Sequence, residues 1–288
     1  MPNEDFETSF AVDESSESTL RIEHRHSDGP NREKITAQTV NSTSFSAKLS
    51  HVQYGKWHGE DAVLLLLNFT FRFQNESIKR FTDATIRLTL EETKDASLAT
   101  PNPRNPKNDP SIVLIAPVQV CGQLTTESKS RHWRLKVPVK YNIAGVDAGV
   151  EAERGGSSVV DVDHMMWLKG FTDSDDRHHA DNAVVWDIQE NSAQKSGILH
   201  RFPAAVVAKM PKEPAYPMKL NVLVTPTMAF TVNPIRLFQK RDDGVYLDRY
   251  TAKGQPFAEG LDFHDPKFPW DEIVKMPEEY SVSPSARI

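Results

Sequence analysis

The dominant pattern along this chain is an alternation of hydrophobic and polar residues with a period of two. In residues 62–74, Phe69, Phe71 and Phe73 alternate with polar residues, as expected of a strand with one buried face. Residues 78–91 continue the alternation after a short polar turn. The two segments are therefore predicted to be adjacent antiparallel strands.

Similar segments recur through the rest of the chain, and none has an apolar stripe of helical period lasting three turns. Many strands separated by turns rich in Pro and Gly are typical of a sandwich or barrel. We predict a mainly β fold, an antiparallel β-sandwich that is C2-like or immunoglobulin-like in general architecture, with two stacked sandwiches as the alternative. The further predicted strands are 112–120, 130–141, 143–153, 157–171, 183–189, 202–210 and 218–232.

Charge and composition divide the chain into three parts. Residues 1–33 contain nine acidic and three basic residues and so carry the whole net charge of −6, which predicts a disordered acidic tail. The sandwich domain is expected over 34–260, followed by a loosely packed C-terminal tail over 261–288. Because the body is neutral overall, the sequence argues against a nucleic-acid partner, which would require a basic excess.

Few features indicate the cellular setting or an enzymatic activity. The single cysteine, Cys121, cannot form a disulfide within the chain, and the acidic N-terminus lacks the apolar stretch of a signal peptide. The longest apolar run, 62–67, is much shorter than the ~20 residues of a membrane-spanning helix. We expect a cytoplasmic protein without a transmembrane segment. No nucleotide-binding, nucleophile or zinc motif is found, which favours a non-enzymatic binding protein but leaves an enzyme open.

The first candidate site is a basic strand face within residues 131–141. His132, Arg134, Lys136 and Lys140 alternate with apolar residues. Basic residues along one strand face can bind the phosphates of an anionic membrane surface. We therefore predict peripheral binding to anionic lipid, with a protein partner or an ordinary solvated strand face as the alternatives.

The second candidate is an aspartate-rich loop. Its members are Asp173, Asp175, Asp176 and Asp181. Carboxylate oxygens from one loop are typical calcium ligands, although the loop lacks the glycine and the glutamate of an EF-hand. Calcium is the one cofactor that the sequence suggests, and a solvated acidic turn is the alternative.

A third candidate is a hairpin over residues 143–168. Small apolar residues alternate with polar ones over 143–153, and Arg154-Gly-Gly156 is predicted to be the turn. Hairpins of this composition occur in pore-forming β proteins, where one face meets lipid and the other water. A hairpin with one buried side would have the same pattern. A further alternative is an enzyme or small-molecule binder that uses an interior pocket of a barrel or sandwich.

One segment resembles sequences seen elsewhere. Trp186-Asp-Ile-Gln-Glu-Asn191, followed by Lys195-Ser-Gly-Ile198 and an apolar strand, is similar to uncharacterised β-rich proteins of filamentous fungi. The resemblance implies a fungal, intracellular setting, but neither a function nor a site residue. The residues themselves predict that Trp186 and Ile188 share a strand face, and that Asn191 and Gly197 lie in turns.

Overall fold

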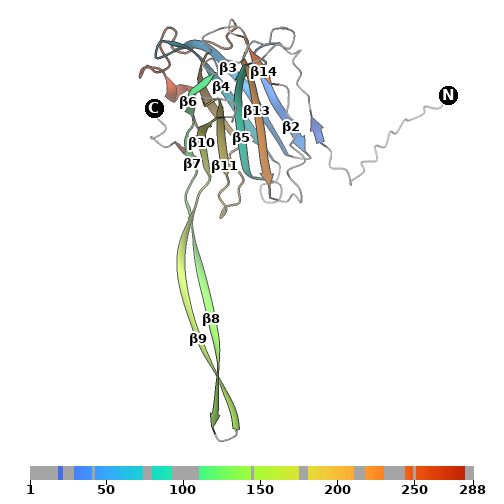
Figure 1. Cartoon of the computed structure of the whole chain (residues 1–288), viewed down its shortest axis with the longest axis vertical. Coiled ribbons are helices and arrows are strands. Elements are labelled where there is room, and N and C mark those ends of the chain that lie inside the picture. The colour runs from blue at the N-terminus through green and yellow to red at the C-terminus, as the bar shows by residue number, and fades with distance from the viewer. Residues whose placement is uncertain are drawn as a thin grey trace, which may run out of the picture.

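The computed structural model describes residues 19–21, 29–40, 43–73, 80–92, 110–143, 146–174, 181–210, 218–229, 244–248 and 251–282. Within β8 and β9, the backbone alone is described for residues 129–160. The described chain forms two large antiparallel sheets, a long separate hairpin and one helical turn (Figure 1). The prediction of a mainly β, antiparallel sandwich is confirmed.

The first sheet contains six strands. Each pairs with its neighbours in antiparallel register, and β12 lies between β4 and β6 although it is distant from both in sequence. The order across the sheet is β1 (Thr19–Arg21), β2 (Lys34–Val40), β3 (Thr43–Trp57), β4 (Glu60–Arg72), β12 (Arg201–Lys209) and β6 (Ser111–Ala116). β1 comes from the predicted acidic tail, most of which lies outside the described residues.

The second sheet contains seven strands and packs against the first. Its central strands β5 and β11 are flanked on both sides by paired neighbours. The order is β14 (Val245–Leu247), β13 (Met218–Met228), β5 (Phe81–Glu92), β11 (Ala183–Gln189), β10 (Trp167–Asp173), β7 (Gln119–Cys121) and β15 (Ser281–Val282).

Apolar side chains from both sheets fill the space between them. The aromatic rings of Phe69 and Phe202 stack with centroids 5.0 Å apart, and the ring of Trp186 lies 5.8 Å from that of Phe69. All three side chains are fully buried. Burial of each large apolar side chain contributes about 1.5–3 kcal/mol, so this interior is a packed core.

The predicted pairing of residues 62–74 with 78–91 is wrong. Both segments form strands, but β4 pairs with β3 and β12, whereas β5 pairs with β11 and β13 in the opposite sheet. The chain therefore crosses between the sheets after β4. Both strands still point one apolar face into the shared core, which is why alternation alone did not distinguish the two arrangements.

Residues 257–274 pack on the outer face of the six-stranded sheet. Phe263 and Phe268 are buried there against Leu64 and Val207, beside the short helix α1 (Trp270–Ile273). The described part of the predicted C-terminal tail is thus held by apolar contacts. Its aromatic residues cover a second apolar surface that the sheet presents away from the core. No helix in the described part of the chain has the length and apolar character of a membrane-spanning helix.

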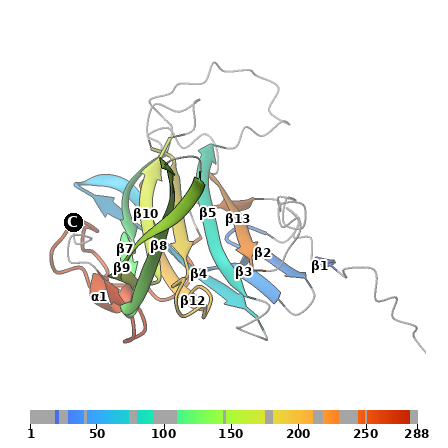
Figure 2. The same cartoon turned by 90° about the horizontal axis from the view of Figure 1, so that it is seen from below.

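The remaining strands, β8 (Thr125–Ile143) and β9 (Val146–His164), form a hairpin that leaves the sandwich. Each strand has 19 residues, and the two pair along their whole length. The hairpin continues the direction of β7 and β10 and projects far beyond the body (Figure 1). Viewed from below, it lies beneath the β7–β10 side of the sandwich (Figure 2).

Candidate functional site

The part of the hairpin farthest from the body pairs apolar positions with apolar positions. We call residues 133–143 and 146–156 the outer segment. Paired positions of an antiparallel ladder lie on the same face of the ribbon. One face therefore carries an almost continuous apolar series, which Arg154, opposite Leu135, interrupts near its inner end. The series pairs Val137 with Ala152, Val139 with Val150, Tyr141 with Ala148 and Ile143 with Val146.

The opposite face of the outer segment is polar. Its pairs are Arg134 with Gly155, Lys136 with Glu153, Pro138 with Glu151, Lys140 with Gly149 and Asn142 with Asp147. By register the outer segment thus has one mostly apolar and one polar face, and its backbone lies away from the sandwich (Figure 1). Pro138 has no backbone N–H, so β8 lacks one backbone donor at this position.

The structure corrects the predicted position of the turn. Arg154-Gly-Gly156 lies inside β9, and the chain reverses between Ile143 and Val146. The hairpin is thus formed by 125–164, not 143–168. A reversal at residues 154–156 would also pair apolar positions, Val150 with Val160 and Ala148 with Val162, so alternation alone did not distinguish it from the observed register. Two adjacent glycines do not force a turn, because extended backbone is also open to glycine.

Residues 125–132 and 157–164 form the inner segment of the hairpin, which differs in composition. Its residues are mostly hydroxylated or charged on both faces. Hydrogen bonds cross between the strands where the side chains are described. Thr126 Oγ1 donates to Asp163 Oδ1 at 2.8 Å, and Ser128 Oγ donates to Asp161 Oδ1 at 2.5 Å. The inner segment is therefore suited to water on both sides.

The root of the hairpin, residues 122–125 and 164–166, joins it to the seven-stranded sheet. Trp167 pairs with Cys121 inside the sheet, and Thr125 pairs with His164 at the start of the hairpin. Three residues on one strand thus face two on the other, which is the pattern of a β-bulge and bends the ribbon. Leu124 and Met165 are 57% and 39% exposed at this junction.

A buried asparagine holds this root. Asn191 is 1% exposed, and its Nδ2 donates to Thr125 Oγ1 and to the carbonyl oxygen of His164, both at 3.1 Å. Its Oδ1 accepts the backbone N–H groups of Ala193 and Gln194. This confirms the predicted turn at Asn191 and shows that it also binds both strands of the hairpin at their first pair.

An ion pair supports the same turn from inside the sandwich. Arg80 Nε and Nη2 donate to the two carboxylate oxygens of Glu190 at 2.8 and 2.9 Å. Glu190 Oε2 also accepts the backbone N–H of Gly197. The hydrogen bonds with Glu190 raise the pKa of Arg80 above its ordinary value. The sequence offered Glu190 and Asn191 as part of a motif, but it gave no sign that they fix a hairpin 66 residues earlier in the chain.

The predicted basic site falls entirely on β8. His132 lies opposite Ser157 in the inner segment, and Arg134, Lys136 and Lys140 lie opposite Gly155, Glu153 and Gly149 in the outer segment. Their strand was predicted as part of the sandwich, but the structure places it in the separate hairpin. The side chains themselves lie outside the described residues.

The aspartate-rich loop is described only in part. Asp173 Oδ2 accepts a hydrogen bond from Arg87 Nη1 at 2.6 Å, and Asp181 Oδ2 accepts one from Thr172 Oγ1 at 2.7 Å. Asp175 and Asp176 lie outside the described residues. Among the side chains that are described, no three potential metal ligands come together. The calcium site therefore stays a prediction.

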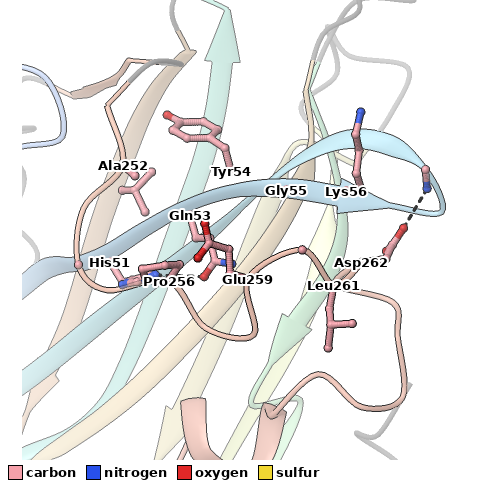
Figure 3. Close-up of a pocket in the computed structure, with 14 residues that line it drawn as sticks. His51, Gln53, Tyr54, Gly55, Lys56, Ala252, Pro256, Glu259, Leu261 and Asp262 are labelled. Atoms are coloured by element: carbon pink, nitrogen blue, oxygen red, sulfur yellow. Dashed lines mark hydrogen bonds between the residues drawn. The ribbon is translucent and has the colours of Figure 1, made fainter.

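A cavity of about 510 Å³ lies between β3 and residues 252–262, on the surface of the sandwich and not between its sheets. Figure 3 shows His51, Gln53 and Glu259 gathered around it. Gln53 Nε2 donates a hydrogen bond to the carbonyl oxygen of Phe257, and Gln53 Oε1 accepts one from the backbone N–H of Phe257. Tyr54 donates to the carbonyl oxygen of Asp248. Asp262 accepts the N–H groups of His58, Gly59 and His264. These contacts hold the C-terminal segment in place.

The free energy of unfolding of the protein should decrease in mild acid because of His51, which lines this cavity. Burial lowers the pKa of His51 below its ordinary value of 6.5. Below that value the unfolded chain binds a proton that the folded chain resists, so acid favours unfolding. We expect the melting temperature of His51→Gln to fall less between pH 7.5 and pH 5.5 than the melting temperature of the wild type. The exposed His264→Gln is the control, and parallel curves for His51→Gln and wild type would refute the assignment.

Comparisons with known proteins yield similarities to solved structures alone. No model of a known protein family matches the chain, and no curated protein is similar to it. Among solved structures, the membrane-inserted form of the Clostridium perfringens NetB toxin aligns with a TM-score of 0.27 and 9% identity, over 82% of this chain and 93% of that chain. A TM-score of this size does not establish a shared fold.

Proposed function

We propose that the protein inserts the outer segment of the β8–β9 hairpin into lipid bilayers and acts as a pore-forming protein. The observation that carries this proposal is the register of the outer segment, which matches apolar positions on one face and polar positions on the other. An uncovered apolar face on a free hairpin is costly in water. In a bilayer, the same face would meet lipid while the polar face met an aqueous channel.

The length of the outer segment fits a bilayer. Residues 133–143 make eleven positions on β8, which rise about 36 Å along a strand and about 26 Å across a membrane at a tilt of 45°. The apolar band of a membrane-spanning β-strand is about 25 Å tall. Trp133 and Tyr141 lie toward the two ends of the segment, and both residue types favour membrane interfaces.

The inner segment makes the hairpin longer than the apolar thickness of a bilayer. Its eight residue pairs from Thr125–His164 to His132–Ser157 rise about 26 Å. They are mostly polar on both faces, so they suit water better than lipid. In this arrangement the sandwich stays above the membrane surface while the outer segment crosses it.

A direct test is the release of a trapped dye from vesicles of phosphatidylcholine and phosphatidylserine. The wild-type protein is expected to release the dye. The matched control lacks the outer segment together with His132 and Ser157: Arg131 and Ser158 form a pair of the same hydrogen-bonding phase as Ile143 and Val146, which a two-residue reversal also joins, so an Asn-Gly turn can join them in the same register. The shortened protein should melt at the same temperature, because the sandwich is unchanged, and should release no dye.

The basic residues of β8 favour a second candidate, peripheral binding to anionic lipid. Arg134, Lys136 and Lys140 could each contribute about 1 kcal/mol near an anionic surface. Co-sedimentation with the same vesicles separates the two functions. Salt-sensitive pelleting without dye release would reject the pore and support surface binding, and neither pelleting nor release would reject both.

A further inference from the structure

The outer backbone edges of β8 and β9 are the part of the described chain best suited to pair with a further strand. β8 and β9 pair with each other and with no other strand of the described chain. Each therefore presents a row of backbone N–H and C=O groups along its outer edge. Such edges recruit further strands in water, and they cannot persist in the hydrocarbon of a bilayer.

The two strands carry opposite charge. β8 contains five basic residues and one acidic residue, and β9 contains five acidic residues and one basic residue. Their net charges are therefore +4 and −4, with histidine taken as neutral. On β8 the charged residues are Lys129, Arg131, Arg134, Lys136, Lys140 and Glu127, and on β9 they are Asp147, Glu151, Glu153, Asp161, Asp163 and Arg154.

We infer that the partner is a second copy of this chain, and that the β8 edge of one copy pairs with the β9 edge of the next. This inference rests on the proposed function. Pairing β8 with β8, or β9 with β9, would bring like charges side by side, which is unfavourable across strands. Pairing β8 with β9 places each strand between two neighbours of opposite charge.

The same pairing also satisfies the geometry of a membrane assembly. β8 and β9 run antiparallel, so a β9 strand added to the free edge of β8 continues an antiparallel sheet with all hairpins pointing the same way. Every sandwich then lies on the same side of the membrane. The contact joins two different edges, so it is heterologous, and repetition can close a ring that leaves no open edge.

Cross-linking between copies tests which edges meet. In a Cys121→Ser background, one variant carries Ser128→Cys on β8 and another carries Asp161→Cys on β9, two positions on the same face of the ribbon. Each is added to the phosphatidylcholine–phosphatidylserine vesicles alone or mixed with the other, with the oxidant copper phenanthroline, which forms a disulfide only between directly adjacent strands. We expect cross-linked dimers from the mixture and little from either variant alone. Dimers from one variant alone, or none from the mixture, would overturn the inference.

Charge variants test the electrostatic cause. Lys129→Glu with Arg131→Glu brings the net charge of β8 to zero, and should slow formation of the cross-linked assembly about tenfold or more at low salt. Lys267→Glu with Lys275→Glu makes the same change in net charge at exposed positions on the sandwich, and should have little effect. Equal rates for both variants would contradict charge-directed pairing.

Dye release measured on the same samples separates this inference from the proposed function. Dye release with dimers from single variants would retain the pore and reject the edge assignment. Dimers from the mixture without dye release would retain the edge assignment and reject the pore.

Discussion

Substitution of Val139 by lysine is expected to abolish dye release by this protein. Val139 pairs with Val150 near the middle of the outer segment, on its apolar face. A lysine on the lipid-facing side of a membrane strand costs about 2–4 kcal/mol near the bilayer midplane. That cost lowers the equilibrium constant for insertion about 30-fold to 1,000-fold per hairpin. The same cost applies to every copy in an assembly.

The matched control for Val139→Lys is Asn142→Lys, which adds the same charge on the opposite face of the same strand. Asn142 pairs with Asp147, on the face proposed to line water. This variant should release dye at close to the wild-type rate. Because both changes lie in the hairpin and outside the sandwich, neither should alter the melting temperature. Equal release by the two variants would reject the proposed orientation of the hairpin.

The second large effect is expected in the body, from Arg80→Met. The side chains of Arg80 and Glu190 are only 8% and 9% exposed. Removing the guanidinium leaves a buried carboxylate without its cation, which typically costs about 3–5 kcal/mol. Chemical denaturation should show a loss of that size in the free energy of unfolding.

Two comparisons test the cause of this loss. Lys48→Met removes the cation of an exposed pair, in which Lys48 and Glu33 side chains are 48% and 56% exposed, and should cost no more than about 1 kcal/mol. The double variant Arg80→Met with Glu190→Met should be more stable than Arg80→Met alone, because no buried charge remains. A double variant less stable than Arg80→Met would show that the cost comes from lost packing and not from the unpaired carboxylate.

Several sequence-based expectations stay predictions. They include the resemblance to fungal proteins, the cytoplasmic location and the calcium site, because the loop that contains Asp175 and Asp176 lies outside the described residues. The predicted disordered tail falls largely on residues 1–18 and 22–28, which lie outside the described residues. The lipid-binding role of Arg134, Lys136 and Lys140 depends on the vesicle experiments.

The sequence failed mainly where partners are distant along the chain. The apolar faces of β4 and β5 were predicted correctly, but their strand neighbours were not. Both strands face the same core from opposite sheets, and the alternation is identical whether a strand pairs with its neighbour or packs against it. The anchoring of Thr125 and His164 by Asn191 was missed for the same reason, since only folding brings these residues together.

The sequence by itself determined most strands from residue 62 onward, their apolar faces and the opposite charges of residues 125–143 and 146–164, but it did not identify β2 and β3. These are local properties, because the two-residue repeat of a strand and the charge of a side chain do not depend on distant contacts. The tertiary structure decided that these segments pair with each other, reverse between residues 143 and 146, and leave the sandwich. Those outcomes depend on register and on a buried anchor formed by residues far apart in the chain.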